Sequence, residues 1–206
     1  MASHQGRTPR TKRTGGDARG EAGAPGADIR GAQGATDPET RARQICLRLL
    51  ALAPRTRAQL ATALRDRGVP DDAAHAVLDR FADVGLIDDA AFARAWVESR
   101  HYSRGLAGRA LRAELRQRGV DDDQIKDAIE DLGPDAEVAT ARRLVERKLA
   151  STRGLPSDAR VRRLAGTLAR KGYPAGLAFR VVKEALEAEG AQVEESCFDE
   201  LDTYTD

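Results

Sequence analysis

Histidines are the first side chains in this sequence that would suit metal binding or catalysis, and there are three of them: His4, His75 and His101. No two of them have the spacing of metal ligands. His75 stands on the pattern of an amphipathic helix, which favours a surface or partly buried side chain, and His101 lies at a junction between helices. We therefore expect no catalytic residue and no metal ligand among them.

Clusters of carboxylates are the second candidates, because neighbouring acidic side chains can hold a metal ion. The clusters are Asp71–Asp72, Asp88–Asp89 and Asp121–Asp122–Asp123. Each lies where a helix is expected to begin, and there a carboxylate accepts backbone N–H bonds and complements the helix dipole. The sequence also lacks a phosphate-binding loop and a G-x-G-x-x-G fingerprint. We expect no metal, no cofactor and no enzymatic activity.

Basic side chains are the remaining candidates. Residues 136–183 have a net charge of +9, whereas residues 184–206 carry nine acidic and no basic side chains. Such a concentration of one sign favours an anionic partner, either nucleic acid or an acidic protein surface. The dense set is Arg142, Arg143, Arg147, Lys148, Arg153, Arg160, Arg162, Arg163, Arg170 and Lys171. A basic strip is predicted to continue onto Arg104, Arg109, Arg112, Arg116 and Arg118. Only Tyr102 and Tyr173 lie near it, which argues against recognition of single strands by base stacking.

Helices are the elements that must position these residues. Apolar side chains recur at i, i+3, i+4 and i+7, as in Ala74, Val77, Leu78 and Phe81, and no alternating run indicates a strand. Thr56 with Gln59 predicts a capping box. Asp71 or Asp72, Asp88 and Ser157 are predicted to cap later helices. The expected nine helices span 38–52, 56–67, 71–84, 89–103, 106–118, 121–132, 135–150, 157–171 and 174–189.

One phrase occurs three times, as LRDRGVPDD (64–72), LRQRGVDDD (115–123) and LARKGYPAG (168–176). Each copy contains the end of a helix, a glycine that stops it and the start of the next helix. The phrase is therefore the joint of a three-helix unit. We predict an all-α chain of three tandem three-helix repeats that form an elongated, curved array.

The expected organisation has two polar ends. It consists of a disordered Gly/Arg-rich arm (1–37), repeat 1 (38–88), repeat 2 (89–134), a basic repeat 3 (135–189) and an acidic tail (190–206). No stretch approaches the length of a membrane span, and no secretory signal is evident. Cys46 and Cys197 lie far apart and favour a buried thiol and a tail thiol in a reducing cytoplasm.

The stretch GLIDDAAFARAWVESR (85–100) is interpreted as architectural. Gly85 would stop a helix, Asp88 would cap the next, and Phe92 and Trp96 would anchor the first repeat to the second. The expected anchors between these repeats are Gly85, Leu86, Ile87, Asp88, Phe92 and Trp96.

This stretch, followed by GRALRAELRQRGVDDDQI (108–125), resembles the RecX family of regulators of the RecA recombinase. The resemblance covers roughly residues 40–187 and is most specific over 85–125. It implies three tandem three-helix repeats, no catalysis, and binding to the RecA filament on single-stranded DNA. We expect the chain to be a monomer. It also implies inhibition of filament extension, ATP hydrolysis and strand exchange in recombination and DNA repair, with direct contact to DNA as a secondary property.

An alternative stays open at this point. Three-helix units also resemble helix-turn-helix domains, so a DNA-binding or architectural protein is the second hypothesis. Base-specific binding of duplex DNA without RecA would favour it.

Overall fold

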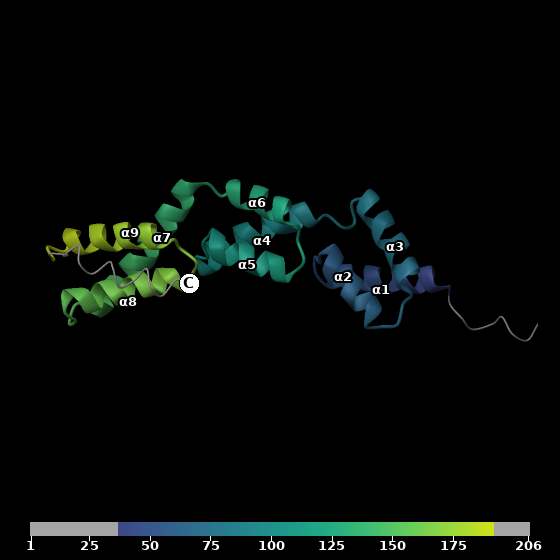
Figure 1. Ribbon diagram of the computed structural model, residues 1–206, viewed down its shortest axis with the longest axis horizontal. Coiled ribbons are helices and arrows are strands. Elements are labelled where there is room, and N and C mark those ends of the chain that lie inside the picture. Colours follow the sequence, from purple (N-terminus) through teal and green to yellow (C-terminus); the bar gives the residue numbers. More distant parts are fainter. Residues whose placement is uncertain (1–36, 192–206) are drawn as a thin grey trace, which may run out of the picture. The chain divides into compact units, whose positions relative to one another are not determined.

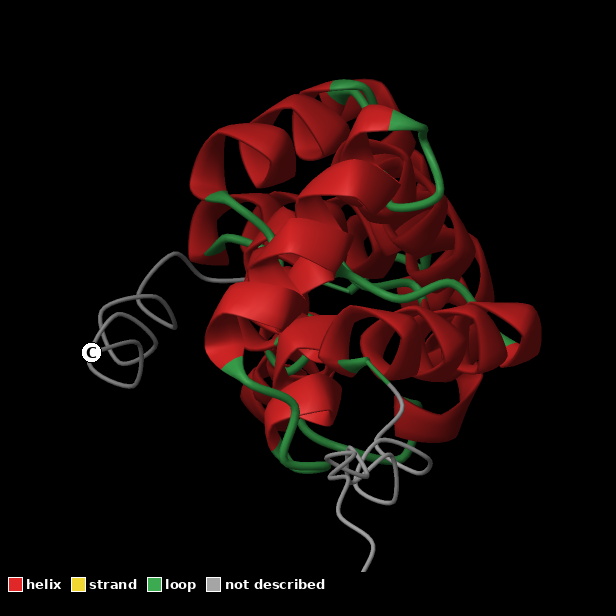
Figure 2. Ribbon diagram, turned by 90° about the vertical axis from the view of Figure 1, so that its right-hand side faces the viewer, coloured by secondary structure: helices red, strands yellow, loops and turns green. Residues whose placement is uncertain are grey.

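The structure is a computed structural model that describes residues 37–191. These residues form nine α-helices and one short 3-10 helix, and no strand occurs among them (Figures 1 and 2). The elements are α1 (Pro38–Leu52), α2 (Arg57–Arg65), α3 (Asp71–Asp83), α4 (Asp89–Arg104), α5 (Gly108–Gln117), α6 (Asp122–Glu130), α7 (Pro134–Leu149), η1 (Ala150–Thr152), α8 (Ser157–Ala169) and α9 (Ala175–Ala188). The prediction of an all-helical chain is confirmed. Its elongated, curved arrangement stays a prediction.

The helices form three successive three-helix domains, α1–α3, α4–α6 and α7–α9. The buried apolar side chains form three separate clusters, and each cluster lies mainly in one domain. The leucines that the repeated phrase aligns lie at the centres of these clusters and are at most 1% exposed. They are Leu60 and Leu64, Leu111 and Leu115, and Leu164 and Leu168. Small Ala, Val and Leu side chains fill the rest, so a chain with few aromatic residues can still build three cores.

The repeated phrase forms the same helix ending in each domain. Gly68, Gly119 and Gly172 have positive φ angles of 68°, 74° and 87°. In the first copy the Gly68 N–H bonds to the Arg65 carbonyl and the Val69 N–H to the Leu64 carbonyl, and the other two copies repeat the pair. This is a Schellman ending, in which glycine takes the left-handed position without steric cost.

The helix starts follow the sequence in part. Thr56 forms the expected capping box with Gln59, and Asp88 accepts the Ala91 N–H at 2.7 Å. The predicted caps at Asp71 or Asp72 and at Ser157 are wrong, because α3 and α8 begin directly after Pro70 and Pro156 without a side-chain cap. Proline at that position fixes an extended entry into the helix, so the polar residue comes one place too late to cap it.

The first joint, between the first and second domains, is made by the N-terminus of α2. The Thr56 hydroxyl donates to the Arg118 carbonyl at 2.6 Å, and the Arg57 N–H donates to Asp89 Oδ1 at 2.9 Å. Burial raises the pKa of the Asp89 carboxyl, although the Arg57 N–H and guanidinium oppose that shift. A helix start in one domain is thus completed by groups of the next.

The second joint repeats this arrangement one domain later, at the N-terminus of α5. The Ala107 N–H donates to the Lys171 carbonyl at 2.9 Å, and the Gly108 N–H donates to Glu137 Oε1 at 2.6 Å. Ala107 is the counterpart of Thr56, since both precede the first residue of the second helix in their domain. The acceptor carboxylate comes in both joints from the first turn of the following domain.

Glycine lets the domains approach closely at both joints. A Cβ atom on Gly119 would lie 2.3 Å from the Ala58 Cβ, and one on Gly172 would lie 2.5 Å from the Ala110 backbone nitrogen. A Cβ on Gly68, which lies in no joint, would meet nothing within 4 Å. The second and third copies of the phrase therefore use glycine for closeness as well as for its φ angle.

The expected arm at 1–37 and the acidic tail at 190–206 lie almost wholly outside the described residues. Cys46 is buried with a free thiol, and Cys197 also lies outside. Within residues 37–191, no helix has the length and apolar character that a membrane crossing requires.

Candidate protein and nucleic-acid interface

Three predicted basic residues line one small hollow beside the second joint. Arg104 ends α4, whereas Arg143 and Arg147 lie one turn apart on α7. The hollow has a volume of about 110 Å³, and its other lining groups include Tyr102 and Ser103. We call this the arginine pocket. Arginine side chains that line one hollow suit phosphate or carboxylate oxygens, which accept paired N–H bonds.

A buried hydrogen-bond chain holds one wall of the arginine pocket. His101 is 1% exposed; its Nδ1 lies 2.9 Å from the Leu106 carbonyl oxygen and its Nε2 lies 2.8 Å from the Thr140 hydroxyl. A neutral ring that donates from Nδ1 and accepts at Nε2 satisfies both contacts. The Thr140 oxygen also accepts from Arg143 at 3.0 Å. His101 therefore links the Leu106 carbonyl, through Thr140, to the side chain of Arg143. The sequence did not indicate this chain of hydrogen bonds.

The remaining strip residues of the third domain are in two environments. Arg142 is exposed and pairs with Glu184 at 3.0 Å. The Lys171 ammonium donates a hydrogen bond to the Arg104 carbonyl, so this side chain is part of the second joint. The exposed members on α7, α8 and the end of α8 are Arg142, Arg143, Arg147, Lys148, Arg162, Arg163 and Arg170. These side chains lie at the surface of the third domain.

Arg160 has to be taken out of the expected basic strip. It is 8% exposed, its guanidinium bonds to Glu189 and to the Thr152 hydroxyl, and both contacts lie inside the third domain. Glu189 also accepts from Arg153 at 2.8 Å. The two arginines, Arg160 first, lower the pKa of the Glu189 carboxyl. Arg160 thus holds the end of α9 against η1 instead of facing a partner.

The second domain contributes a row of basic residues on α5. Arg109, Arg112 and Arg116 recur at i, i+3 and i+7, which places them along one side of the helix. Arg109 and Arg116 are exposed, and Arg112 is half-buried. Arg116 bonds to Asp122 at 2.7 Å, which lowers the pKa of that carboxyl. The row is therefore partly neutralised at its C-terminal end.

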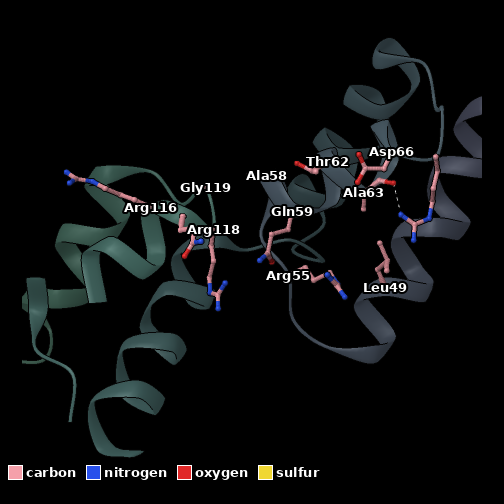
Figure 3. A pocket seen from close by; sticks show the side chains of 12 residues that line it. Leu49, Arg55, Ala58, Gln59, Thr62, Ala63, Asp66, Arg116, Arg118 and Gly119 are labelled. Carbon is pink, nitrogen blue, oxygen red and sulfur yellow. Dashed lines mark hydrogen bonds between the residues drawn. The ribbon is translucent and has the colours of Figure 1, made fainter. Parts of the chain in front are cut away.

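A basic cleft at the first joint was only partly expected. It has a volume of about 550 Å³ and lies between α2 and the end of α5. Figure 3 shows Arg55 and Gln59 on one side of it and Arg118 on the other. Arg67 and Arg116 complete its basic lining, and Asp66 is its one acidic residue. The sequence does not single out Arg55 and Arg67, because residues 38–88 hold eight basic and seven acidic side chains and show no concentration of one charge.

Trp96 is the centre of the segment 85–100, and arginines cover its ring. The Cζ atoms of Arg118 and Arg100 lie 3.7 and 4.1 Å from the ring centroid, as in cation–π pairs. Its indole N–H donates to Glu114 at 2.8 Å, and Phe92 stacks on it at 5.7 Å. Trp96 is therefore packed by its own domain and remains only partly buried.

The other expected anchors behave differently from one another. Ile87 is buried in the first core, Asp88 caps α4 and Gly85 has a positive φ of 73°. Leu86 is 49% exposed, so the prediction that it packs at the joint is wrong. The backbone N–H groups of Leu86 and Ile87 both bond to the Phe81 carbonyl, and of the two side chains only that of Ile87 is buried.

The carboxylates of the acidic clusters accept hydrogen bonds from backbone N–H groups at the starts of helices. Asp88 and Asp121 accept backbone N–H groups, and Asp89 joins two domains. Among residues 37–191, no group of histidine, cysteine and acidic side chains could hold a metal ion. His75 is exposed, as expected.

Comparison with known proteins identifies a family. Models of the first, second and third three-helix domains of RecX match residues 42–81, 88–129 and 135–182. The regulatory protein RecX of Thermobifida fusca is 61% identical over 175 residues, which cover 85% of this chain and 92% of the relative. That of Streptomyces coelicolor is 60% identical over 158 residues, with 77% and 84% covered. That of Mycolicibacterium smegmatis is 49% identical over 166 residues, with 77% and 88% covered.

Two crystal structures share the fold. RecX from Lactobacillus salivarius superposes with a TM-score of 0.68 at 19% identity, covering 72% of this chain and 96% of that chain. A second structure of a regulatory protein RecX gives 0.65 at 23% identity, with 72% of each chain covered. At these identities the likeness concerns the three-domain helical fold alone.

Proposed function

Because the chain belongs to the RecX family of regulatory proteins, we propose that it binds the RecA filament on single-stranded DNA and inhibits its extension, ATP hydrolysis and strand exchange. It acts in recombination and DNA repair, as a monomer in the cytoplasm, and uses no cofactor. RecX proteins are regulators and not enzymes, in agreement with the expectation from the sequence.

The arginine pocket is the observation that carries this proposal beyond family membership. A filament presents acidic side chains and DNA phosphates at a regular spacing, and three guanidinium groups in a prepared hollow can bind either. The chain from His101 through Thr140 to Arg143 orders one of these groups before the partner arrives. Such preorganisation lowers the entropic cost of binding.

Direct contact with DNA is a secondary part of the proposal. Tyr102, at the rim of the arginine pocket, is 67% exposed and presents its ring to solvent. Tyr173 is 3% exposed and donates to the Gly105 carbonyl, so it cannot stack on a base. One stacking residue with several arginines favours sequence-independent contact with the backbone over base-specific recognition.

RecA-catalysed ATP hydrolysis on single-stranded DNA tests the proposal. The unaltered chain should inhibit hydrolysis at a low molar ratio to RecA. The double substitution Arg104→Glu/Arg147→Glu leaves the buried chain through Thr140 intact, and it should raise the concentration for half-inhibition on the order of tenfold or more. Arg48→Glu/Arg65→Glu makes the same change of charge on exposed residues of α1 and α2 and should have little effect.

Unchanged inhibition by the first variant, with helicity preserved in both, would contradict the role of the arginine pocket. Tight, base-selective binding of duplex DNA without RecA would instead support the alternative of a helix-turn-helix DNA-binding protein.

A further inference from the structure

An apolar groove adjoins the basic cleft at the first joint. Its volume is about 480 Å³, and it lies between the end of α1 and the outer side of α4. It is lined mainly by Leu50, Ala53, Pro54, Leu86, Phe92 and Trp96. Arg55 lines both the groove and the cleft, so the two hollows are neighbours on one surface.

The arginines around these hollows have donors that the described residues do not satisfy. The Nε–H groups of Arg55 and Arg118 are buried, and no acceptor lies within hydrogen-bonding distance in residues 37–191. Burying a charged donor without a partner is costly, so an acceptor delivered to this place from outside would be favoured. Arg118 is also held against the Trp96 ring, which limits its escape to solvent.

The composition of this surface resembles that of binding hot spots. Tryptophan and arginine are the residues most enriched at such positions, and a partly buried Trp96 between two arginines belongs to that class. Leu86, which the joint leaves 49% exposed, forms part of the apolar lining. An exposed leucine beside an aromatic pair has a physical explanation if another molecule covers it.

We propose that the apolar groove and the basic cleft together dock a segment of a RecA subunit that presents a large apolar side chain next to a carboxylate. The apolar side chain enters the groove against Phe92 and Trp96, and the carboxylate accepts from Arg55 and Arg118. This inference rests on the proposed function, and it adds a second contact, one domain away from the arginine pocket.

The chemistry of the surface selects a protein partner over the alternatives. A DNA backbone would satisfy the arginines, but its phosphates would leave the apolar groove uncovered. An apolar ligand alone would cover the groove and leave the buried donors of Arg55 and Arg118 without an acceptor. A peptide with both kinds of group fulfils both requirements.

The single tryptophan of the chain gives a direct measurement. The full chain is produced with 5-fluorotryptophan, so that Trp96 gives the only fluorine signal whatever tryptophans RecA contains. Addition of purified RecA, with and without single-stranded DNA, should shift or broaden the Trp96 resonance. A resonance that stays unchanged at RecA concentrations that inhibit ATP hydrolysis would overturn the proposal.

Substitutions at the rim provide the second measurement. Leu86→Glu should raise the concentration for half-inhibition of RecA roughly tenfold, because it places a carboxylate in the apolar groove. Leu47→Glu is its matched control, since Leu47 is 46% exposed on α1 and lines neither hollow. Ala95→Gln, on the exposed side of α4, narrows the groove without adding charge and should act in the same direction.

The outcomes separate this inference from the proposed function. If Arg104→Glu/Arg147→Glu impairs inhibition of RecA and the variants Leu86→Glu and Ala95→Gln do not, the proposed function stands and the proposal that RecA docks in the apolar groove is wrong. If the unaltered chain neither inhibits RecA nor responds to it in the fluorine spectrum, both fail. Two further results would contradict the docking of RecA in the groove but not the proposed function. In the first, oligothymidylate alone shifts the Trp96 resonance as much as RecA does, which would make DNA the occupant. In the second, deletion of residues 192–206 shifts the resonance without RecA, which would make that segment the occupant.

Discussion

At the first and second joints, the start of the second helix of one domain meets the end of the second helix of the next domain through nearly the same hydrogen bonds, yet the surfaces beside the two joints differ. At the first joint the donor to the Arg118 carbonyl is the Thr56 hydroxyl, and at the second the donor to the Lys171 carbonyl is a backbone N–H. The first joint borders hollows of about 550 and 480 Å³, whereas the hollow beside the second is about 110 Å³.

The difference comes from what fills the space beside each joint. Tyr173 is buried at the second joint and bonds to the Gly105 carbonyl, and Leu144 lies against Gly105. The corresponding positions after Gly68 and Gly119 hold the smaller Val69 and Val120. One connection is thus closed by a large aromatic side chain, while the other remains open enough to receive a partner.

Alanine at the joint glycines should have the largest effect. Gly172→Ala is expected to destabilise the chain by roughly 3 kcal/mol or more, because its Cβ meets the Ala110 backbone at a φ of 87°. Gly119→Ala should cost a similar amount, but Ala58→Gly should restore part of it by removing the opposing Cβ. Urea unfolding measures both.

The control for this pair is Gly68→Ala, which meets no neighbour and should cost only about 1 kcal/mol for its left-handed backbone. Ala110→Gly should fail to rescue Gly172→Ala, since the Ala110 nitrogen remains in place. Equal rescue at both joints would show that the Ala110 Cβ, and not its backbone nitrogen, opposes a side chain at position 172.

Removal of the hydroxyl at the first joint should have the next largest effect. Thr56→Val leaves the Gln59 N–H and the Arg118 carbonyl without their partner and should cost about 2 kcal/mol. Thr56→Ser keeps the hydroxyl and should cost less than half as much. Equal losses for valine and serine would indicate that the methyl group, and not the hydrogen bond, stabilises this joint.

Asp89 at the first joint should make stability fall as pH rises. Its pKa is raised above the ordinary 3.8, so the folded state holds this proton more tightly than the unfolded state. The stabilisation is complete below pH 3.8 and is lost as pH rises through the higher folded value. Asp89→Asn keeps an acceptor for the Arg57 N–H and should abolish this decline.

Unfolding in urea at pH values from 3 to 6 measures this decline in stability. Asp89→Ala removes the acceptor and should destabilise the chain at every pH. A decline of the same size in the Asp89→Asn variant would assign the pH dependence to another group.

Glu189, outside both joints, should give the smallest effect and the opposite sign. Its pKa lies below the ordinary 4.5 because Arg160 and Arg153 stabilise the carboxylate. Its contribution is present above pH 4.5 and is lost as pH falls through the lower folded value. In Glu189→Gln, the melting temperature should fall less between pH 5 and pH 3 than in the unaltered chain, and an identical fall would refute this.

Much of the fold could be predicted from the sequence, because it depends on local signals. Leucines four residues apart, followed by a glycine, specify a buried helix face and its ending, and Leu60, Leu111 and Leu164 all lie in cores. The caps at Pro70 and Pro156 were missed because the proline, and not the polar residue after it, sets the first turn.

The candidate site was less predictable, because it depends on contacts between distant residues. The pattern of charges places Arg160 in the basic strip, and nothing near it in the sequence announces Glu189, 29 positions later. The Arg118 carbonyl that completes the start of α2 is a backbone group and leaves no trace in the residue types. Arg55 becomes notable only when α5 is packed opposite it.

The bond from Thr56 to Arg118 also has a consequence for synthesis on the ribosome. Its partners are 62 residues apart in the sequence, so this hydrogen bond at the start of α2 can form only after the end of α5 has been synthesised. At about 10 residues per second this delay is roughly 6 s, during which the first domain must persist with one end unfinished. Each newly made domain then stabilises the one translated before it, and the nascent chain gains stability from its N-terminus onward.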